Sequence, residues 1–218
     1  YKIEKIFGLH TKQNMPVGTI AIAPGPFSAA VDRFLYTVKG MGCHGSAPQT
    51  GLDPIPAAAR LVGSLQEIVS RRISPMETAV ISVTRFTSGT SWNIIPETAR
   101  LEGTVRTFKA QAEGLEREGY QVEFTWIPGC PATNNDADLA ELVRKEAMEE
   151  GFHVTLQHPE MGGEDFSCYQ ELVPGAFFHV GTGGKYPAHN SKFTVDPAAL
   201  LGASKLMSEI VKKALKAS

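Results

Sequence analysis

The order of strands and helices predicted for residues 29–127 is compatible with few folds. A helix is predicted over residues 53–72, with Asp53 as its N-cap, Pro54 in its first turn and an apolar stripe on one face. One strand is predicted before this helix and three after it, each rich in β-branched and aromatic residues. The stripe consists of Ala58, Leu61, Leu65 and Ile68, and the strands are "DRFLYTVKG", "TAVISVTRFTSG", "ARLEGTVRTF" and "YQVEFTWI".

Residues 109–119 stand where a second helix would complete this order. They allow only about three turns, since each helical residue adds about 1.5 Å, and we expect further residues to belong in this segment. The order strand, helix, strand, strand, helix, strand is the split ferredoxin-like pattern. The sequence therefore predicts an inserted α+β ferredoxin-like domain over residues 29–127.

Two outer pieces, residues 1–28 and 128–218, are predicted to be parts of one α/β sheet domain that the insert interrupts. A short strand is expected to end at Gly8, and the run "AFFHVGT" is apolar enough for a central strand. Two amphipathic helices follow the insert, one starting at Asn135 or Asp136 and the other at Asp196. Their expected inward positions are Leu139, Leu142, Val143 and Ala147 in the first, and Leu200, Ala203, Met207, Ile210 and Val211 in the second.

The charge and cysteine content exclude several classes of protein. With 21 basic and 23 acidic residues well interspersed, the chain has no basic stripe for nucleic acid. No run reaches the roughly 18 to 20 apolar residues of a membrane span. Three cysteines without a CxxC pair suggest neither a disulfide framework nor a zinc knuckle, so we expect a soluble, cytoplasmic protein. The chain begins at Tyr1, inside an apparent strand, so any targeting segment would lie outside it.

Two histidines are candidates for a metal site. Ligands of open α/β sheets gather beyond the carboxyl ends of the strands. His10 follows the strand expected to end at Gly8, and His189 follows the strand expected to end near Gly181. Imidazole is a common zinc ligand, so the two could serve one metal centre, although a pair of surface loop histidines would give the same pattern.

Three polar residues of the insert form a second candidate group. His44 lies in the loop "GCHGSAP", Asn93 stands at the start of a predicted strand, and Arg106 lies near its far end. Asn93 and Arg106 are separated by an odd number of positions, so in one regular strand they would face opposite ways unless a bend near Pro96 intervened. From the residues alone, structural explanations are favoured: a capping or loop residue for His44, a turn residue at the strand start for Asn93, and a cross-strand ion pair of Arg106 with Glu102 or Glu97.

Six successive segments resemble the signatures of one enzyme family, in order and over nearly the whole chain. It is the aminoacylase/carboxypeptidase metallopeptidase family, in the branch of hippurate hydrolase, N-acyl-amino-acid amidohydrolases and indole-acetyl-amino-acid hydrolases. The segments are "IFGLHT", "VGTIAIAPGP", "GCHGSAPQTGLDPIPAAARLV", "NIIPETARLEGTVRTF", "GGEDFS" and "HNSKFTVDPAAL".

The resemblance implies a role for each candidate residue. His10 and His189 match metal ligands of a catalytic domain that holds two divalent ions, such as Zn, Mn, Co or Ni. His44, Asn93 and Arg106 match residues of a lid and dimerisation domain that approach the substrate, partly from the neighbouring subunit. His44 would stabilise the developing oxyanion, and Arg106 and Asn93 would bind a carboxylate.

The resemblance also implies that part of the family's machinery is outside this sequence. The first metal motif and the pair of glutamates, one of them the general base, lie upstream of Tyr1 in the family. Residues 1–28 and 128–218 would then be the C-terminal part of an incomplete catalytic domain. We expect the chain alone to be inactive and its metal occupancy to be low, because only two of the family's protein ligands are present.

The predicted activity is metal-dependent hydrolysis of the acyl amide of N-acyl amino acids by a homodimer that pairs through the insert. One alternative is a dipeptidase or carboxypeptidase with the same centre, and another is a truncated, non-catalytic module that dimerises or binds ligands. In "GGEDFS", Glu164 and Asp165 could orient a metal ligand, but Asp165 is expected first of all to cap the next helix. Cys43 is expected to be structural.

Overall fold

The computed structural model describes residues 2–107 and 121–216, and the chain folds into two compact units. Unit 1 comprises Tyr1–Ala29 and Pro131–Ser218, and unit 2 comprises Ala30–Cys130. The helix expected over residues 109–119 lies outside the described residues. Within the part of the chain that is described, no helix combines the length and the apolarity that crossing a membrane requires.

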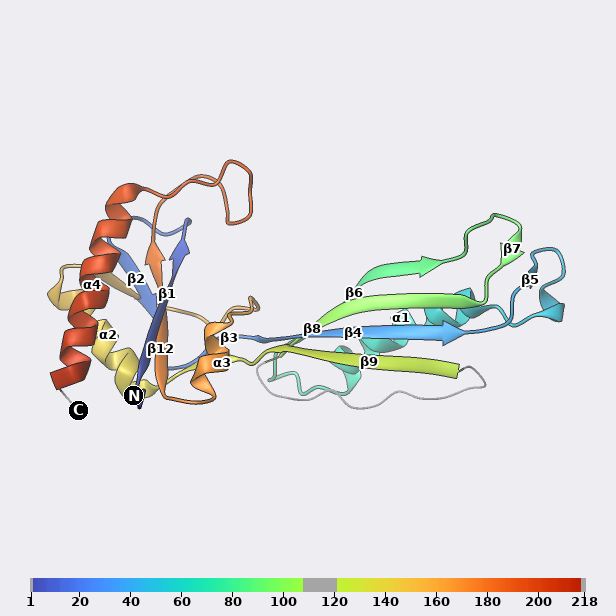
Figure 1. Ribbon diagram of the computed structural model, residues 1–218, viewed down its shortest axis with the longest axis horizontal. Coiled ribbons are helices and arrows are strands. Elements are labelled where there is room, and N and C mark those ends of the chain that lie inside the picture. The colour runs from blue at the N-terminus through green and yellow to red at the C-terminus, as the bar shows by residue number, and fades with distance from the viewer. Residues whose placement is uncertain (1, 108–120, 217–218) are drawn as a thin grey trace. The chain divides into compact units, whose positions relative to one another are not determined.

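The centre of unit 1 is a four-stranded sheet (Figure 1). In spatial order its strands are β1 (Ile6–Lys12), β12 (Gly175–Gly181), β2 (Thr19–Ile22) and β11 (His153–Leu156). β1 is parallel to β12, β12 is antiparallel to β2, and β2 is parallel to β11. β12 is thus an interior strand, as its apolar run predicts.

Two helices cover one face of this sheet, α2 (Ala137–Glu149) and α4 (Pro197–Lys216) (Figure 1). Asp136 caps α2 by accepting hydrogen bonds from two backbone N–H groups at 3.0 Å, which decides between the two predicted starts. The core between helices and sheet consists of Ile20, Ile22, Leu139, Ala140, Val143, Ala147, Ala176, Phe178, Val180, Ala203, Leu206 and Ile210.

The set of α4 residues predicted to face the core is only partly correct. Ala203 and Ile210 are buried as expected, but Leu200 and Val211 are 52% and 42% exposed. The buried stripe instead runs through Ala199, Ala203, Leu206, Ile210 and Ala214. Ala199, Leu206 and Ala214 were not among the predicted inward positions, so the core-facing side of α4 is shifted relative to the prediction.

The opposite face of the sheet carries aromatic residues and a short helix, α3 (Phe166–Gln170). Phe166 and Phe27 both lie against Phe177 of β12, with ring centroids 5.2 and 5.5 Å away. Phe27 belongs to β3 (Gly25–Ser28), which pairs antiparallel with β10 (Thr133–Asn135).

Gly8 does not end β1, contrary to the sequence prediction. The strand continues to Lys12 because its parallel pairing with β12 extends to Gly181. A Cβ at position 8 would lie 2.7 Å from the ring of Phe166, so this glycine makes room for an aromatic ring. His10 is therefore inside the strand and not beyond it.

In its described residues, unit 2 contains an antiparallel sheet with helix α1 (Pro54–Arg71) against one face (Figure 1). The spatial order of its strands matches the ferredoxin-like prediction, with the first strand of the unit between the third and the fourth. The strands in that order are β6 (Ala79–Ser88), β8 (Thr98–Thr107), β4 (Ala30–Lys39) and β9 (Gln121–Cys130). Buried residues between helix and sheet are Phe34, Tyr36, Val38, Ala58, Leu65, Ile81, Ala99, Leu101 and Val105.

A separate two-stranded ribbon, β5 (Cys43–His44) and β7 (Ile94–Ile95), extends from one end of this sheet, with a short 3-10 helix at Pro48–Thr50 (Figure 1). At the other end of this sheet, the first strand of unit 2, β4, pairs with its last strand, β9, and Val31 lies opposite Cys130. Gly129 is required there, since a Cβ would lie 2.0 Å from the carbonyl oxygen of Val31.

Candidate functional site

The carboxyl ends of β1 and β12 form one edge of the unit 1 sheet. The two strands are parallel neighbours, and Lys12 pairs with Gly181 where both end. His10 lies on β1 two residues before this end, and β12 leads into the loop that carries His189. This connectivity is compatible with the prediction that His10 and His189 bind metal at the same end of the strands, and that prediction stays untested.

His189 has a backbone conformation that indicates a constrained loop. Its φ of 66° is the one positive value found for a residue other than glycine in the described parts of the chain. Neighbouring turns fix the loop: the side chain of Asn190 accepts a hydrogen bond from the N–H of Lys192 at 2.9 Å, and Phe193 N–H donates to the Asn190 carbonyl at 3.0 Å. A strained, exposed histidine in an ordered loop is an observation that supports a functional role.

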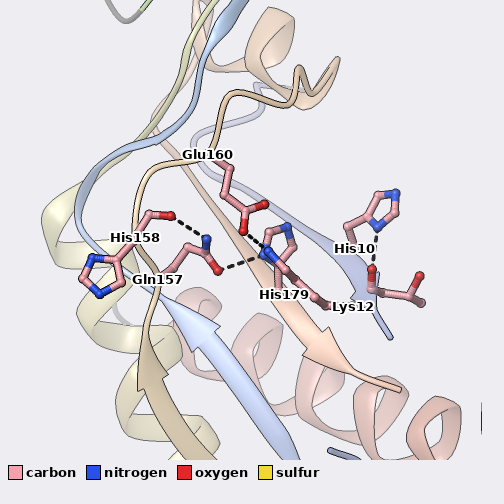
Figure 2. A network of polar contacts seen from close by, with 7 residues as sticks. His10, Lys12, Gln157, His158, Glu160 and His179 are labelled. Carbon is pink, nitrogen blue, oxygen red and sulfur yellow. Dashed lines mark hydrogen bonds and ion pairs between the residues drawn. The ribbon is translucent and has the colours of Figure 1, made fainter. Parts of the chain in front are cut away.

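The sequence reasoning missed a second histidine beside His10. His179 pairs with His10 in register across β1 and β12, and the two ring centroids lie 6.4 Å apart with the rings nearly perpendicular. Figure 2 shows His179 on its strand next to Gln157 and the Lys12–Glu160 ion pair. The signal in the sequence is a single polar residue in the otherwise apolar run "AFFHVG".

Gln157 determines which nitrogen of His179 carries the proton. The side-chain N–H of Gln157 donates to the carbonyl of His158 at 2.6 Å, so the amide oxygen of Gln157 must point toward His179. This oxygen lies 3.0 Å from Nδ1 of His179 and can only accept, so Nδ1–H donates. The neutral imidazole is thus held as one tautomer, with its lone pair on Nε2.

The surroundings of His179 keep it uncharged. Burial lowers the pKa of His179 to about 4, with a further contribution from the Lys12 ammonium, while Glu160 acts in the opposite direction. Burial alone would raise the pKa of Glu160, but hydrogen bonds from Lys12 and Gln157 lower it overall. Lys12 and Glu160 are therefore a charged pair beside a neutral imidazole.

This pKa shift predicts a pH-dependent stability. An unfolded histidine titrates near 6.5 and folded His179 near 4, so the unfolded state binds more protons between these values. The contribution of neutral His179 to the free energy of unfolding is fully present above pH 6.5 and is lost as the pH falls toward 4. In EDTA, the unfolding free energy of the wild type should fall by about 2 kcal/mol more than that of His179→Asn between pH 7 and 5. Equal losses in urea titrations of the two proteins would contradict this.

The side chain of Asp165 does not cap α3, contrary to the sequence prediction. Asp165 occupies the N-cap position of α3 without a side-chain hydrogen bond to the helix. Instead Glu164 accepts from Phe166 N–H at 3.5 Å. Burial and the neighbouring Asp165 raise the pKa of Glu164, whereas the hydrogen bond from Phe166 and the nearby His10 lower it. Glu164 is thus an acidic neighbour of His10.

In unit 2 the structure brings His44 and Asn93 together. β5 and β7 pair His44 with Ile94, and the N–H of Gly45 donates to the carbonyl of Asn93 at 2.8 Å. Nδ1 of the exposed His44 accepts from the N–H of Ser46 at 3.2 Å, so a neutral His44 carries its proton on Nε2. The ring therefore presents an N–H donor outward.

Arg106 lies at the other end of unit 2. The premise that Asn93 and Arg106 share one strand was wrong, because β7 pairs with β5 and β8 starts only at Thr98. From Thr98 to Arg106 the strand covers eight residues, which is about 26 Å at 3.3 Å per residue. The alternative partner Glu102 is paired with Arg33 and Arg85.

The free thiol of Cys43 is consistent with a structural role. Cys43 is half-buried on β5, and a Cβ added at Gly51 would lie 2.6 Å from its Sγ. The side chain thus fills the space against a glycine. It is a packing residue next to His44.

The donor set at the sheet edge fits a divalent metal only in part. Nδ1 of His10 lies 2.9 Å from the carbonyl of Thr11, which can only accept, so Nδ1–H donates and Nε2 keeps its lone pair. This is the arrangement of metal-bound histidines, whose second nitrogen usually donates to a carbonyl or carboxylate. Within residues 2–107 and 121–216, however, no three His, Cys, Asp or Glu side chains are placed to hold one metal ion.

Comparisons with known proteins point to one family. The protein named N-acetylcysteine deacetylase from Bacillus subtilis (strain 168) is 41% identical over 221 residues, covering 95% of this chain and 58% of the relative. N-acetyldiaminopimelate deacetylase from Bacillus pumilus (strain SAFR-032) is 33% identical over 223 residues, covering 95% of this chain and 59% of the relative. The chain thus spans less than three fifths of the length of these relatives.

A solved structure agrees with this result. A Bacillus subtilis crystal structure described as a dinuclear metal binding peptidase from the M20 family superposes with a TM-score of 0.79 and 35% identity. The match covers 98% of this chain and 58% of that chain. The family model described as Peptidase family M20/M25/M40 matches residues 1–213. The chain therefore belongs to peptidase family M20/M25/M40.

Proposed function

We propose that this chain is part of a metal-dependent amidohydrolase that cleaves the acyl amide of N-acyl amino acids. The observation that carries the proposal is its similarity, over nearly the whole chain, to proteins named as acyl-amino-acid deacetylases. Unit 1 would supply the C-terminal part of the catalytic domain, and unit 2 would be the lid and dimerisation domain. The named relatives favour an acetyl group over the benzoyl group of hippurate.

His44 would stabilise the transition state. Amide hydrolysis places negative charge on the carbonyl oxygen, and a donor aimed at that oxygen lowers the barrier. The hydrogen bond from Ser46 N–H to Nδ1 orients the ring and leaves Nε2–H free to donate. A neutral imidazole can therefore serve as the donor without first taking up a proton.

Asn93 and Arg106 would bind the carboxylate of the substrate, with Arg106 as a two-pronged donor. A small N-acyl amino acid cannot span the roughly 26 Å of β8 that separates the two ends of unit 2. His44 and Asn93 would thus reach one substrate together with an Arg106 from another copy. This separation supports a homodimer in which residues of both subunits complete a site.

His10 and His189 would hold divalent metal ions, together with ligands that the family has upstream of this chain. When bound, the ions would polarise the scissile carbonyl and activate water. Glu164 would act through His10, because the nearby His10 contributes to lowering the pKa of the Glu164 carboxyl.

The shortage of ligands gives a prediction for this chain alone. Two imidazoles fall short of the usual three or four protein ligands of a zinc site, so metal binding should be weak. After incubation with Zn²⁺ or Mn²⁺ and gel filtration, elemental analysis should find well under one metal ion per chain. Stoichiometric metal would contradict the proposed division of the site.

The edge strands of unit 2 give a prediction about assembly. β6 is a ten-residue edge strand with one charged residue, Arg85, and no proline, so a second copy could pair with it. Light scattering should give about twice 23.5 kDa for the wild type. Thr84→Lys on β6 should give monomers, since paired copies would bring like charges together. Thr125→Lys on the other edge strand, β9, is the matched control and should stay dimeric; the opposite pattern would refute pairing through β6.

The activity itself is tested by release of the free amine. A protein that also carries the family's upstream glutamate pair should hydrolyse N-acetyl-amino acids in the presence of Mn²⁺ or Zn²⁺, while the chain alone should not. Faster turnover of dipeptides than of acetyl-amino acids would favour the dipeptidase alternative. If intact mass shows that the native protein is only about 23.5 kDa, the non-catalytic module is favoured.

A further inference from the structure

Two serine hydroxyls bond the two polar residues at the end of the β5–β7 ribbon. The Oγ atom of Ser46 lies 2.7 Å from Nδ1 of His44, and the hydroxyl of Ser91 donates to Oδ1 of Asn93 at 3.1 Å. Each serine is two residues away from the side chain that it bonds, so a short stretch of chain forms both contacts. The same arrangement at both residues indicates a common purpose.

The direction of the bond to His44 follows from the backbone. The N–H of Ser46 donates to Nδ1 at 3.2 Å, so the neutral ring has its lone pair on this nitrogen. The hydroxyl of Ser46 at 2.7 Å therefore donates to Nδ1 as well. Turning the ring over would replace Nδ1 by a carbon atom and would lose both bonds. Ser46 thus holds the ring in the orientation that leaves Nε2–H for another molecule.

The bond to Asn93 has the same consequence. An asparagine amide has an oxygen that accepts and a nitrogen that donates. The Ser91 hydroxyl occupies Oδ1, so the Nδ2–H₂ group of Asn93 is left to bind another molecule. The N–H of Gly45 donates to the Asn93 carbonyl at 2.8 Å, which ties this residue to the segment of His44. Both side chains are thus left with N–H donors, and the carbonyl and carboxylate oxygens of an N-acyl amino acid accept.

We propose that Ser46 and Ser91 are positioning residues of the substrate site. Each serine holds the polar side chain that it bonds, so that this side chain presents an N–H donor to the substrate. A group oriented before the substrate binds loses less freedom on binding. The inference rests on the roles proposed above for His44 and Asn93, and the family resemblance assigns no role to either serine.

The two serines should affect different kinetic constants. The measurements use a protein that also carries the family's upstream glutamate pair. Ser46→Ala should lower kcat about 3- to 10-fold, the net effect of one hydrogen bond, with little change in KM, because His44 acts on the transition state. Ser91→Ala should raise KM by a similar factor with little change in kcat, because the carboxylate bound by Asn93 is present throughout the reaction.

Conservative and control variants separate positioning from loop stability. Ser46→Thr and Ser91→Thr keep a hydroxyl and should recover most of the loss. Thr50→Ala is the matched control, because Thr50 is exposed in the same loop and its hydroxyl donates to the Ala47 carbonyl. It should match the wild type. An equal loss in Thr50→Ala would overturn the proposal, since any lost hydroxyl of the loop would then have the same effect.

Double variants test whether each serine acts through its partner. In a His44→Ala background the Ser46 hydroxyl has no ring to position, so adding Ser46→Ala should change kcat less than about 2-fold. Adding Ser91→Ala to Asn93→Ala should likewise leave KM within about 2-fold. If the serine effects persist in full, the hydroxyls support the loop itself and the proposal is wrong.

A spectroscopic measurement needs no enzymatic activity. Long-range ¹H–¹⁵N NMR of the chain alone should show the neutral His44 ring with its proton on Nε2 and an unprotonated Nδ1. Ser46→Ala should shift the Nδ1 signal, because this nitrogen loses a hydrogen bond, and Thr50→Ala should not. An unchanged Nδ1 signal in Ser46→Ala would contradict the proposed contact.

Two results separate this proposal from the proposed function. If His44→Ala and Asn93→Ala impair the reaction while neither serine variant does, the proposed function stands and the roles of the serines are wrong. If His44→Ala and Asn93→Ala leave kcat and KM unchanged, the proposed roles of these two residues fail, and those of the serines fail with them.

Discussion

Replacing His44 with Ala is expected to lower kcat of the complete enzyme by about 10²- to 10³-fold, the effect typical of removing one oxyanion donor. The reason is the fixed orientation of the ring, whose Nδ1 accepts from Ser46 N–H and whose Nε2–H is left to donate. KM should change little, because the charge that the donor stabilises exists mainly in the transition state. A His44→Gln variant, which retains an N–H donor, should recover part of the loss.

Mixing mutant subunits tests whether His44 serves the neighbouring subunit. A dimer of one His44→Ala subunit and one His189→Ala subunit has one intact site only if His44 acts in trans, because an intact His44 then meets an intact metal centre. Activity should return when the two inactive proteins exchange subunits. If exchange is verified by mass and activity stays absent, His44 serves its own subunit or has no catalytic role.

Replacing Asn135 with Leu is expected to reduce the free energy of unfolding by roughly 3 kcal/mol or more, because three buried backbone groups would lose their partner. The Asn135 side chain is in a residue only 4% exposed, and it donates to the carbonyls of Ala23 and Phe177 at 3.0 and 2.8 Å. It also accepts from Phe177 N–H at 2.8 Å. It therefore ties the interior strand β12 to the segment that follows β2.

The neighbouring residue provides the control for this variant. Asn134 is in the same strand, but its side chain is exposed. Asn134→Leu should leave the urea midpoint, followed by far-UV circular dichroism, nearly unchanged. Similar losses in the two variants would show that β10 is sensitive to any leucine and that the three hydrogen bonds are not the cause.

The elements with local signals could be predicted from the sequence. Asp53 accepts from Ile55 N–H at 2.9 Å and Pro54 opens the helix, as the sequence indicates. The strand order of unit 2 follows from counting strands and helices, because the ferredoxin-like pattern leaves few alternatives. The continuation of β1 past Gly8 could not be predicted, since the reason for that glycine is the ring of Phe166, far away in the sequence.

The arrangement of the candidate site residues depends on contacts between segments far apart in the sequence, and local sequence patterns do not reveal such contacts. His44 and Asn93 meet because β5 and β7 form their own ribbon, whereas the sequence suggested that Asn93 continues into the strand of Arg106. His179 carries no motif, and it stands out only once Gln157 and His10 are seen beside it. The family resemblance supplied the candidate residues, and only the fold shows that Arg106 is far from His44 and Asn93.

The pairing of Val31 with Cys130 means that unit 2 begins and ends at adjacent points. A segment with neighbouring ends behaves as a transferable module, since removing it leaves a gap that one short turn can close. Residues 30–130 can therefore be exchanged between relatives, or expressed separately, without rebuilding the unit 1 sheet. Such grafts would show which half of a deacetylase determines substrate choice, provided that Gly129 is kept at the junction, where any side chain would collide with the Val31 carbonyl.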